Sequence, residues 1–208
     1  MKKEEKTRRT YEKILNAAIV EFGTKSYENA SLNTICSENN ISKGLLYHNF
    51  KGKDDLYLQC VKKCFHDMYD YLQNTPYESD TPQESLNNLL HLRQEYFREN
   101  PYYCSIFFHA ILQPPAHLRQ ELHNLQKEFH SFYADCFRRL LGQLHLRDSI
   151  TVDMAAEYLI LFQEMFNGYF QNKMSENNDF HSLIEAHEGN LSGILDIILY
   201  GLVERPKL

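Results

Sequence analysis

The sequence lacks tryptophan, has no run of eighteen apolar residues and contains no pair of cysteines at CxxC spacing. Without such a run a membrane-spanning helix is not expected, and the first residues, Met-Lys-Lys-Glu-Glu-Lys, are not typical of a signal peptide. The five cysteines are odd in number, which suits a reducing cytoplasm better than a disulfide-linked secreted protein. We therefore expect a cytoplasmic protein that does not enter a membrane.

Catalytic signatures are missing as well: HExxH, Walker A, GxSxG and GxGxxG patterns do not occur. Ten histidines invite a metal hypothesis, and His117 with Glu121, like Cys60 with Cys64, are four residues apart. None of these has a third and fourth ligand at a recognised spacing, so surface or packing roles are favoured over metal or redox sensing. We expect no catalytic residues, no cofactor and no metal.

Charge is divided unevenly along the 208 residues, although the net charge is −6. Residues 1–65 hold 12 basic and 8 acidic residues, net +4, and residues 66–208 hold 10 and 20, net −10. The basic part could meet an anionic partner such as DNA, while the acidic part would be held away from it. Random drift along the chain is the alternative explanation.

Apolar residues recur at helical spacing almost throughout, and no alternating strand pattern is evident, so the fold is predicted to be all-α. Prolines bound the later helices: a polar loop spans residues 75–82, and further breaks fall at Asn100-Pro101 and Pro114-Pro115. The helices expected after the N-terminal part cover residues 54–74, 82–99, 101–113, 117–142 and 154–173, and a last one follows a polar loop at 174–179 and ends near Val203.

Residues 31–53 carry the most informative pattern, two short helices joined by a tight turn. Ser31 can cap the first helix and Ser42 the second, because a serine hydroxyl accepts from an unpaired N–H of the first turn. Asn40 tolerates a left-handed turn conformation between them. Ile41, Leu46 and Phe50 are predicted to face the core, which leaves these residues of the second helix pointing outward: Lys43, Gly44, Leu45, Tyr47 and His48.

This outward face suits the DNA major groove, where helix-turn-helix proteins place their second helix. Lys43 can pair with a phosphate or a guanine edge, Leu45 can touch a thymine methyl, and Tyr47 can donate to phosphate. Gly44 permits a close backbone approach, and Lys53 lies where it could hold a phosphate. The alternative is a helical hairpin with a solvated polar face. The predicted DNA-binding residues are Ser31, Asn33, Thr34, Ser42, Lys43, Gly44, Leu45, Tyr47, His48 and Lys53.

At these positions the chain resembles the tetracycline-repressor (TetR) family of bacterial regulators over about its first sixty residues. The resemblance rests on Ile14, Leu15, Ala18, Phe22, Ser31, Ile35, Ile41, Ser42, Lys43, Gly44, Leu46, Tyr47, His48, Phe50, Lys51, Lys53 and Leu56. Three positions depart from the family pattern: Ser26 and Asn40 stand where glycine is usual, and Cys36 where alanine is usual. Ser26 puts the geometry of its turn in question if the backbone there needs a positive φ.

The resemblance implies a DNA-binding domain over residues 1–52 and a helical ligand-binding and dimerisation domain over residues 53–208. It also implies a homodimer through the last two helices, a double-stranded DNA operator and a small-molecule effector. Repression of a palindromic operator, relieved by a hydrophobic or aromatic inducer, is the expected function. A transcriptional activator of the same architecture is the first alternative. A helical carrier or enzyme, or an adaptor that binds only proteins, would show no dependence on DNA.

Aromatic residues crowd the middle helices and could line the effector site, although core packing explains any single one of them as well. The predicted ligand-binding residues are Tyr96, Tyr103, Phe107, Phe108, Phe129, Tyr133, Phe162, Phe166 and Tyr169. For the dimer, small residues allow close approach of helices, with packing inside one chain as the alternative. Those residues are Ala155, Ala156, Gly168, Gly189, Gly193 and Gly201.

Overall fold

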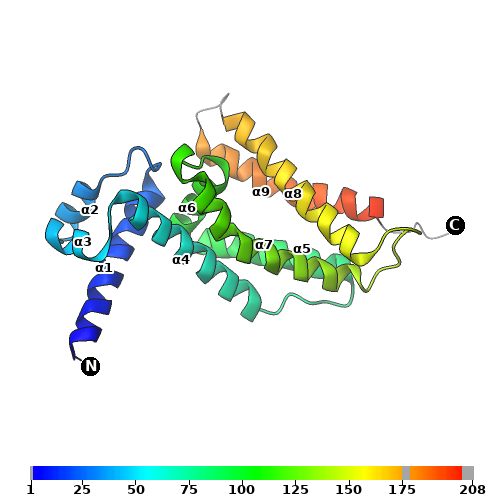
Figure 1. Cartoon of the computed structure of the whole chain (residues 1–208). Coiled ribbons are helices and arrows are strands. Elements are labelled where there is room, and N and C mark those ends of the chain that lie inside the picture. The colour runs from blue at the N-terminus through cyan, green and yellow to red at the C-terminus, as the bar shows by residue number, and fades with distance from the viewer. Residues whose placement is uncertain (1, 175–178, 203–208) are drawn as a thin grey trace. The chain divides into compact units, whose positions relative to one another are not determined.

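The computed structural model of the chain describes residues 2–174 and 179–202 (Figure 1). Its elements are α1 (Lys2–Thr24), α2 (Leu32–Glu38), α3 (Lys43–Asn49), α4 (Lys53–Asn74), α5 (Pro82–Glu99), α6 (Pro101–Leu112), the 3₁₀ turn η1 (Ala116–Leu118), α7 (Arg119–Leu141), α8 (Val152–Met174) and α9 (Phe180–Leu202). All of these elements are helical, which confirms the all-α prediction. None of the helices in this described part is long and apolar enough to cross a membrane.

The predicted helix limits agree with the observed ones to within about two residues, with one difference of type. The helix expected over residues 117–142 is a 3₁₀ turn followed by α7. Proline at Pro114 and Pro115 imposes an extended entry, and the tight 3₁₀ turn, closed by a 3.0 Å bond from Leu118 N–H to the Pro115 carbonyl, returns the chain to helix. Most of the loop predicted at 174–179 and the end predicted near Val203 lie outside the described residues.

The chain divides into two compact units. The first unit holds residues 1–67 and 97–125, and the second holds residues 68–96 and 126–208. The predicted domain boundary between residues 52 and 53 separates DNA binding from ligand binding and dimerisation. A division of the chain into compact units does not test it, so it stays a prediction.

In the first unit, α1 packs against α2 and α6. Its buried face carries Ile14, Ala18 and Phe22, spaced for one side of a helix. Helix α6 approaches so closely that a Cβ added to Gly23 would lie 2.5 Å from the Cβ of Tyr102. Glycine is therefore required at this crossing, where α1 rests directly on α6.

In the second unit, α8 packs along α9, and the core between the helices is rich in aromatic side chains. Phe166 and Phe170 are buried on α8, as are Leu191 and Leu195 on α9. Their spacing of four residues places each pair on one helical face. The described core of this unit is mostly apolar, and its buried polar residues include Ser85 and a charged cluster centred on Arg93.

Candidate nucleic-acid interface

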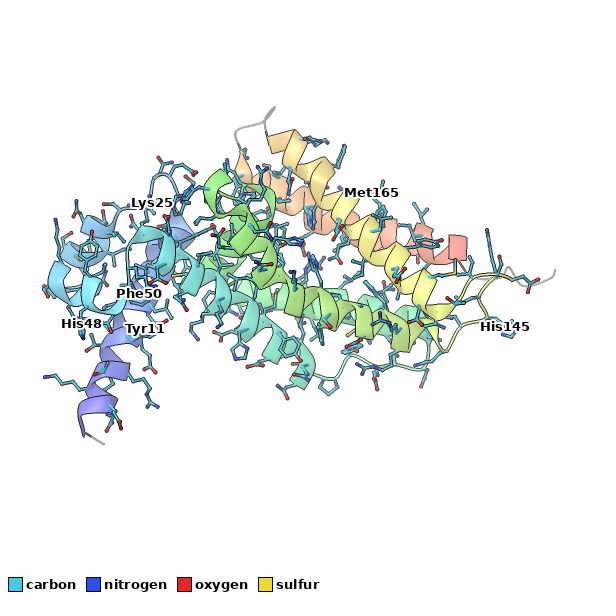
Figure 2. All side chains as sticks on the ribbon, viewed as in Figure 1. Tyr11, Lys25, His48, Phe50, His145 and Met165 are labelled. Carbon is cyan, nitrogen blue, oxygen red and sulfur yellow. The ribbon has the colours of Figure 1, made fainter. Side chains whose placement is uncertain are left out.

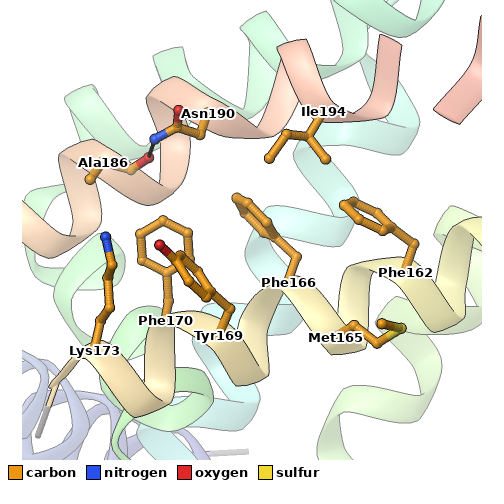
Figure 3. Close-up of a pocket in the computed structure, with 9 residues that line it drawn as sticks. All are labelled: Phe162, Met165, Phe166, Tyr169, Phe170, Lys173, Ala186, Asn190 and Ile194. Atoms are coloured by element: carbon orange, nitrogen blue, oxygen red, sulfur yellow. Dashed lines mark hydrogen bonds between the residues drawn. The ribbon is translucent and has the colours of Figure 1, made fainter. Parts of the chain in front are cut away.

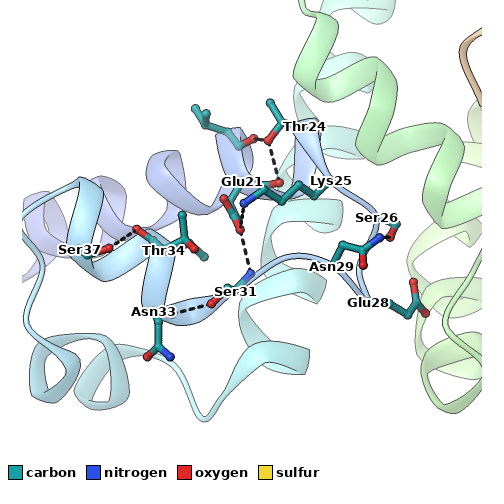
Figure 4. A network of polar contacts seen from close by, with 12 residues as sticks. Glu21, Thr24, Lys25, Ser26, Glu28, Asn29, Ser31, Asn33, Thr34 and Ser37 are labelled. Carbon is teal, nitrogen blue, oxygen red and sulfur yellow. Dashed lines mark hydrogen bonds and ion pairs between the residues drawn. The ribbon is translucent and has the colours of Figure 1, made fainter.

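The first helix of the pair, α2, is held by contacts at its N-terminus (Figure 4). The Ser31 hydroxyl accepts from the backbone N–H of Asn33 at 3.2 Å, which confirms the predicted cap. The buried carboxylate of Glu21 accepts from the Ser31 N–H at 2.9 Å and from the Lys25 ammonium at 2.8 Å. Sequence reasoning missed Glu21, although an acidic residue on the apolar face of α1 was a signal that it had a fixed partner.

The turn between α2 and α3 has the conformation predicted for it. Asn40 has φ = 51°, in the left-handed region that asparagine tolerates, and Ile41 N–H donates to the Cys36 carbonyl at 3.0 Å. Ser26 is not among the residues with positive φ, so the turn after α1 does not require glycine there. Both departures from the family pattern are accommodated by the backbone.

The second helix, α3, is fixed from its core side. Ser42 caps it by accepting from the Leu45 N–H at 3.2 Å, and Leu46 and Phe50 are buried. The ring of Tyr11 stacks on Phe50 with centroids 4.8 Å apart, so the end of α3 is held against α1 (Figure 2). These contacts bury the core side of α3 and leave most of its remaining side chains facing outward.

The outer face of α3 is open to solvent, as predicted. Tyr47 is 58% exposed and Leu45 39%, values high for large apolar side chains. Asn33, Ser42, Lys43, Gly44, Leu45, Tyr47 and His48 are exposed, while Ser31, Thr34 and Lys53 are half-buried. The structure brings these ten residues onto α2, α3 and the start of α4 in the first unit. Their contact with DNA stays a prediction.

Lys53, the first residue of α4, lies on Tyr27. Its Nζ is 4.6 Å from the centroid of the Tyr27 ring and 3.3 Å from the Glu28 carbonyl oxygen. Neither contact is with a carboxylate, so the charge of Lys53 is held in place without being neutralised. Such a group can still pair with a phosphate, together with the cations and hydroxyls of α2 and α3.

The predicted ligand-binding residues are not gathered at one site within either unit. Tyr103, Phe107 and Phe108 belong to the first unit, where Phe107 and Phe108 pack with each other and with Phe97. The second unit contains the other six residues of the set: Tyr96, Phe129, Tyr133, Phe162, Phe166 and Tyr169.

Three residues of that set, Phe162, Phe166 and Tyr169, line a groove of about 540 Å³ between α8 and α9 (Figure 3). The groove is bounded by Phe162, Met165, Phe166, Tyr169, Phe170, Lys173, Ala186, Asn190 and Ile194. Met165 is 65% exposed and Tyr169 53%, so the groove opens on the surface of the second unit.

Within the part of the chain that the structure describes, no group of three or more His, Cys, Asp or Glu residues could hold a metal ion. The five cysteines are all free thiols, four buried and Cys104 half-buried. Burial raises the pKa of the Cys60 and Cys64 thiols, which opposes formation of the reactive thiolate.

Comparison with known proteins agrees with this geometry. Residues 14–60 match the model of bacterial regulatory proteins of the tetR family, and residues 81–202, more than half of the chain, match the tetracyclin repressor-like C-terminal domain. A biofilm operon icaADBC HTH-type negative transcriptional regulator, IcaR from Staphylococcus aureus, is 41% identical over 63 residues. That match covers 30% of this chain and 32% of the relative.

Solved structures resemble the chain over nearly its whole length. A transcriptional regulator from Cytophaga hutchinsonii has a TM-score of 0.70 at 16% identity and covers 92% of this chain and 97% of its own. FadR from Bacillus subtilis, solved with stearoyl-CoA, has a TM-score of 0.66 at 15% identity and covers 92% and 99%. At such identities these structures support the fold alone. With both family models matched in order, the chain belongs to the TetR family of bacterial regulatory proteins.

Proposed function

We propose that the protein is a ligand-responsive, homodimeric repressor that acts in the cytoplasm on a palindromic operator. The observation that carries the proposal is the outer face of α3, where Lys43, Leu45 and Tyr47 are exposed on a capped and packed helix. The IcaR relative, which is a negative regulator by name, supports repression as the direction. An activator would use the same geometry, so the direction is the first point to measure.

Binding of the protein to duplex DNA from the region upstream of its own gene tests the proposal. We expect a steep negative dependence of affinity on salt, because each phosphate contact releases counterions. Lys43→Ala should cost about 1–3 kcal/mol and relax sequence preference, whereas Tyr47→Ala should weaken binding to all sequences. Lys62→Ala is the matched control. It removes an exposed lysine of the same unit, on α4 and about 13 Å along that helix from Lys53. If all three variants bound DNA with the same affinity as the wild type, the DNA-binding site would not lie on α3.

The proposed dimer contact is the outer face of α8 and α9. Exposed apolar residues recur along α8 at spacings of three and four, and Ile197 on α9 is 71% exposed. The exposed stripe on α8 consists of Met154, Tyr158, Leu161, Met165 and Tyr169. A continuous apolar stripe of this length is unusual on a monomer surface, and a second copy of the chain would cover it. The groove between the two helices lies on the same face.

Small residues of α9 support the same contact. Gly189 and Gly193 are exposed, and a Cβ added at either would meet nothing within 4 Å, which leaves room for an approaching helix. Ala155 and Ala156 differ from the prediction: both are buried inside their own chain and out of reach of a partner. They allow close packing within the unit.

Analytical ultracentrifugation tests this contact. Ile197→Glu and Met165→Glu should shift the protein from dimer to monomer, because each would bury an unpaired carboxylate in the proposed apolar interface. Asn87→Glu places the same charge on an exposed residue of α5, in the same unit but on neither of the two proposed interface helices, and should leave the dimer intact. An unchanged dimer in both glutamate variants would place the interface elsewhere.

The proposed effector is a small hydrophobic or aromatic molecule that contacts aromatic residues of the domain after residue 53. It would act by binding the DNA-free state better than the DNA-bound state. Stearoyl-CoA, which occupies the Bacillus subtilis neighbour, is a reasonable first probe. Release of bound operator on its addition, measured by fluorescence anisotropy, would assign an acyl-CoA effector, and retention of the complex would exclude this one.

A further inference from the structure

A polar cluster in the first unit joins three separate segments of the chain. Tyr27 follows α1, Asp54 lies in the first turn of α4, and His117 lies in η1, ninety residues after Tyr27. The Tyr27 hydroxyl donates to one oxygen of the Asp54 carboxylate. The other oxygen is 3.3 Å from Nε2 of His117, and this nitrogen is also 3.4 Å from the Tyr27 hydroxyl. Both oxygens of Asp54 therefore have partners.

Ring contacts hold the same three segments together. The Tyr27 and His117 ring centroids are 5.6 Å apart, and Tyr27 also contacts Tyr57 of α4 at 5.1 Å. The hydrogen bond from Tyr27, followed by the contact with His117, lowers the pKa of Asp54, so its carboxylate is ionised at neutral pH. An ionised and occupied carboxylate thus lies directly beside Lys53 in the sequence.

The Lys53 ammonium group lies on the ring of Tyr27 and against the carbonyl of Glu28, and its charge also acts through space on Asp54, whose pKa it helps to lower. Asp54 is the nearest acid in the sequence and already attracts Lys53 through space, and an oxygen that lost its donor would be free to pair with the ammonium group directly. Because His117 occupies one oxygen, the ammonium group stays on the Tyr27 ring, at the start of α4 beside the helix-turn-helix.

We propose that His117 is a positioning residue for DNA binding: by holding Asp54 and Tyr27, it keeps Lys53 available to a phosphate. This inference rests on the proposed function, since it assumes that Lys53 contacts DNA. His117 lies outside the helix-turn-helix and touches none of the predicted DNA-binding residues in the contacts that the structure gives it. Its effect on DNA would pass through Tyr27 and Asp54.

The test measures operator affinity at several salt concentrations for His117→Ala, Lys53→Ala and the double variant. Each single variant should bind about five- to tenfold more weakly, and the salt slope should fall by about one, as for loss of one phosphate contact. The double variant should bind no more weakly than Lys53→Ala alone, because both changes remove the same contact. His123→Ala, an exposed histidine on α7, is the control and should bind like the wild type.

A rescue separates positioning from a general structural effect. In the Asp54→Asn background, the competing carboxylate is gone, so His117→Ala should have less than about a twofold effect. A fold defect caused by loss of His117 would persist in that background.

Additive losses in the double variant, or a His117→Ala variant that binds like the wild type, would overturn the inference while leaving the proposed function intact. If the wild type bound no DNA, or if Lys53→Ala had no effect on affinity or salt slope, Lys53 would not contact DNA. The inference about His117 would then fail because its assumption is wrong.

Discussion

The two compact units hold their carboxylates in similar ways but in opposite surroundings. In the first unit, Asp54 contacts Tyr27 and His117 on the surface, with the Asp54 and His117 side chains 53% and 56% exposed. In the second unit, Glu188 contacts Arg93 and His187, with side chains 14%, 2% and 4% exposed. The exposed cluster costs little to form and contributes little stability, whereas the buried one is costly to desolvate and costly to break.

The buried cluster also joins more of its unit. Arg93 lies on α5, Glu188 and His187 on α9, and His187 Nε2 is 2.9 Å from the amide oxygen of Asn167 on α8. The fully buried Tyr133 of α7 lies beside the same guanidinium. Three helices thus share one polar network inside an aromatic core, and Tyr133 of a fourth lies against it. The comparison indicates that the contacts of Asp54 in the first unit position side chains on the surface, while those of Glu188 in the second unit fix how helices pack.

The largest expected difference between the clusters concerns stability. Arg93→Met should destabilise the protein by about 3–5 kcal/mol, because Glu188 would remain buried without its cation. His117→Ala should cost less than about 1 kcal/mol, since its pairing with Asp54 is exposed to water. Urea denaturation measures the free energy of unfolding of both variants. One fixed protein concentration is used, because the apparent stability of a dimer depends on concentration. Similar losses in the two variants would contradict the distinction between the clusters.

A double variant tests whether the buried Arg93–Glu188 pair itself stabilises the fold. Arg93→Met combined with Glu188→Leu removes both members of the pair, and we expect it to recover much of the stability lost by Arg93→Met alone. Failure to recover would mean that the network positions helices in a way that apolar packing cannot replace.

A smaller effect is expected where the first unit relies on close packing. Gly23→Ala introduces a methyl group 2.5 Å from the Cβ and 2.7 Å from the Cα of Tyr102, and backbone atoms cannot move aside cheaply. We expect a loss of about 1–3 kcal/mol, typical of overpacking. Gly44→Ala is the control for DNA-free stability, because a Cβ there would meet nothing within 4 Å. Denaturation curves that coincide for Gly23→Ala and the wild type would show that α1 and α6 can separate without cost.

The sequence predicted local structure well because its signals were local. Ser31 and Ser42 act as caps, Asn40 takes the left-handed turn, and Leu46 and Phe50 are buried, each decided by neighbours within a few residues. The buried Arg93 was not predicted, because its partner Glu188 is 95 residues away. For the same reason the sequence, which favours a surface or packing role for His117 over metal binding, does not predict its contact with Asp54.

The surface of the last two helices was predicted in part. Spacing alone placed small residues on α8 and α9, but it could not decide which of them face the chain's own core. Ala155 and Ala156 are buried, whereas Gly189 and Gly193 are open to solvent. The aromatic residues proposed for the effector met the same difficulty, since an aromatic side chain fills a core and lines a pocket equally well.

The smallest effect expected is a dependence of stability on pH, and it compares one buried histidine from each unit. Burial lowers the pKa of His109 on α6 and of His187 on α9, in the latter case with Arg93 adding to the shift and Glu188 opposing it. Each histidine binds a proton more readily in the unfolded chain, so stability is complete above the ordinary value of about 6.5 and falls as the pH drops from there toward the lowered value.

Urea denaturation at pH 7.5 and 5.5 should therefore show a less stable protein at the lower pH. His109→Gln and His187→Gln should each reduce this difference, because glutamine cannot take up the proton. His91→Gln, in which an exposed histidine is changed, should leave the difference unchanged. Glu188 opposes the shift at His187, whereas His109 bonds mainly to the neutral Ser105 carbonyl at 2.8 Å. A reduction at His109 with none at His187 would mean that the buried carboxylate cancels the cost of burial, and the second unit would then tolerate acid better than the first.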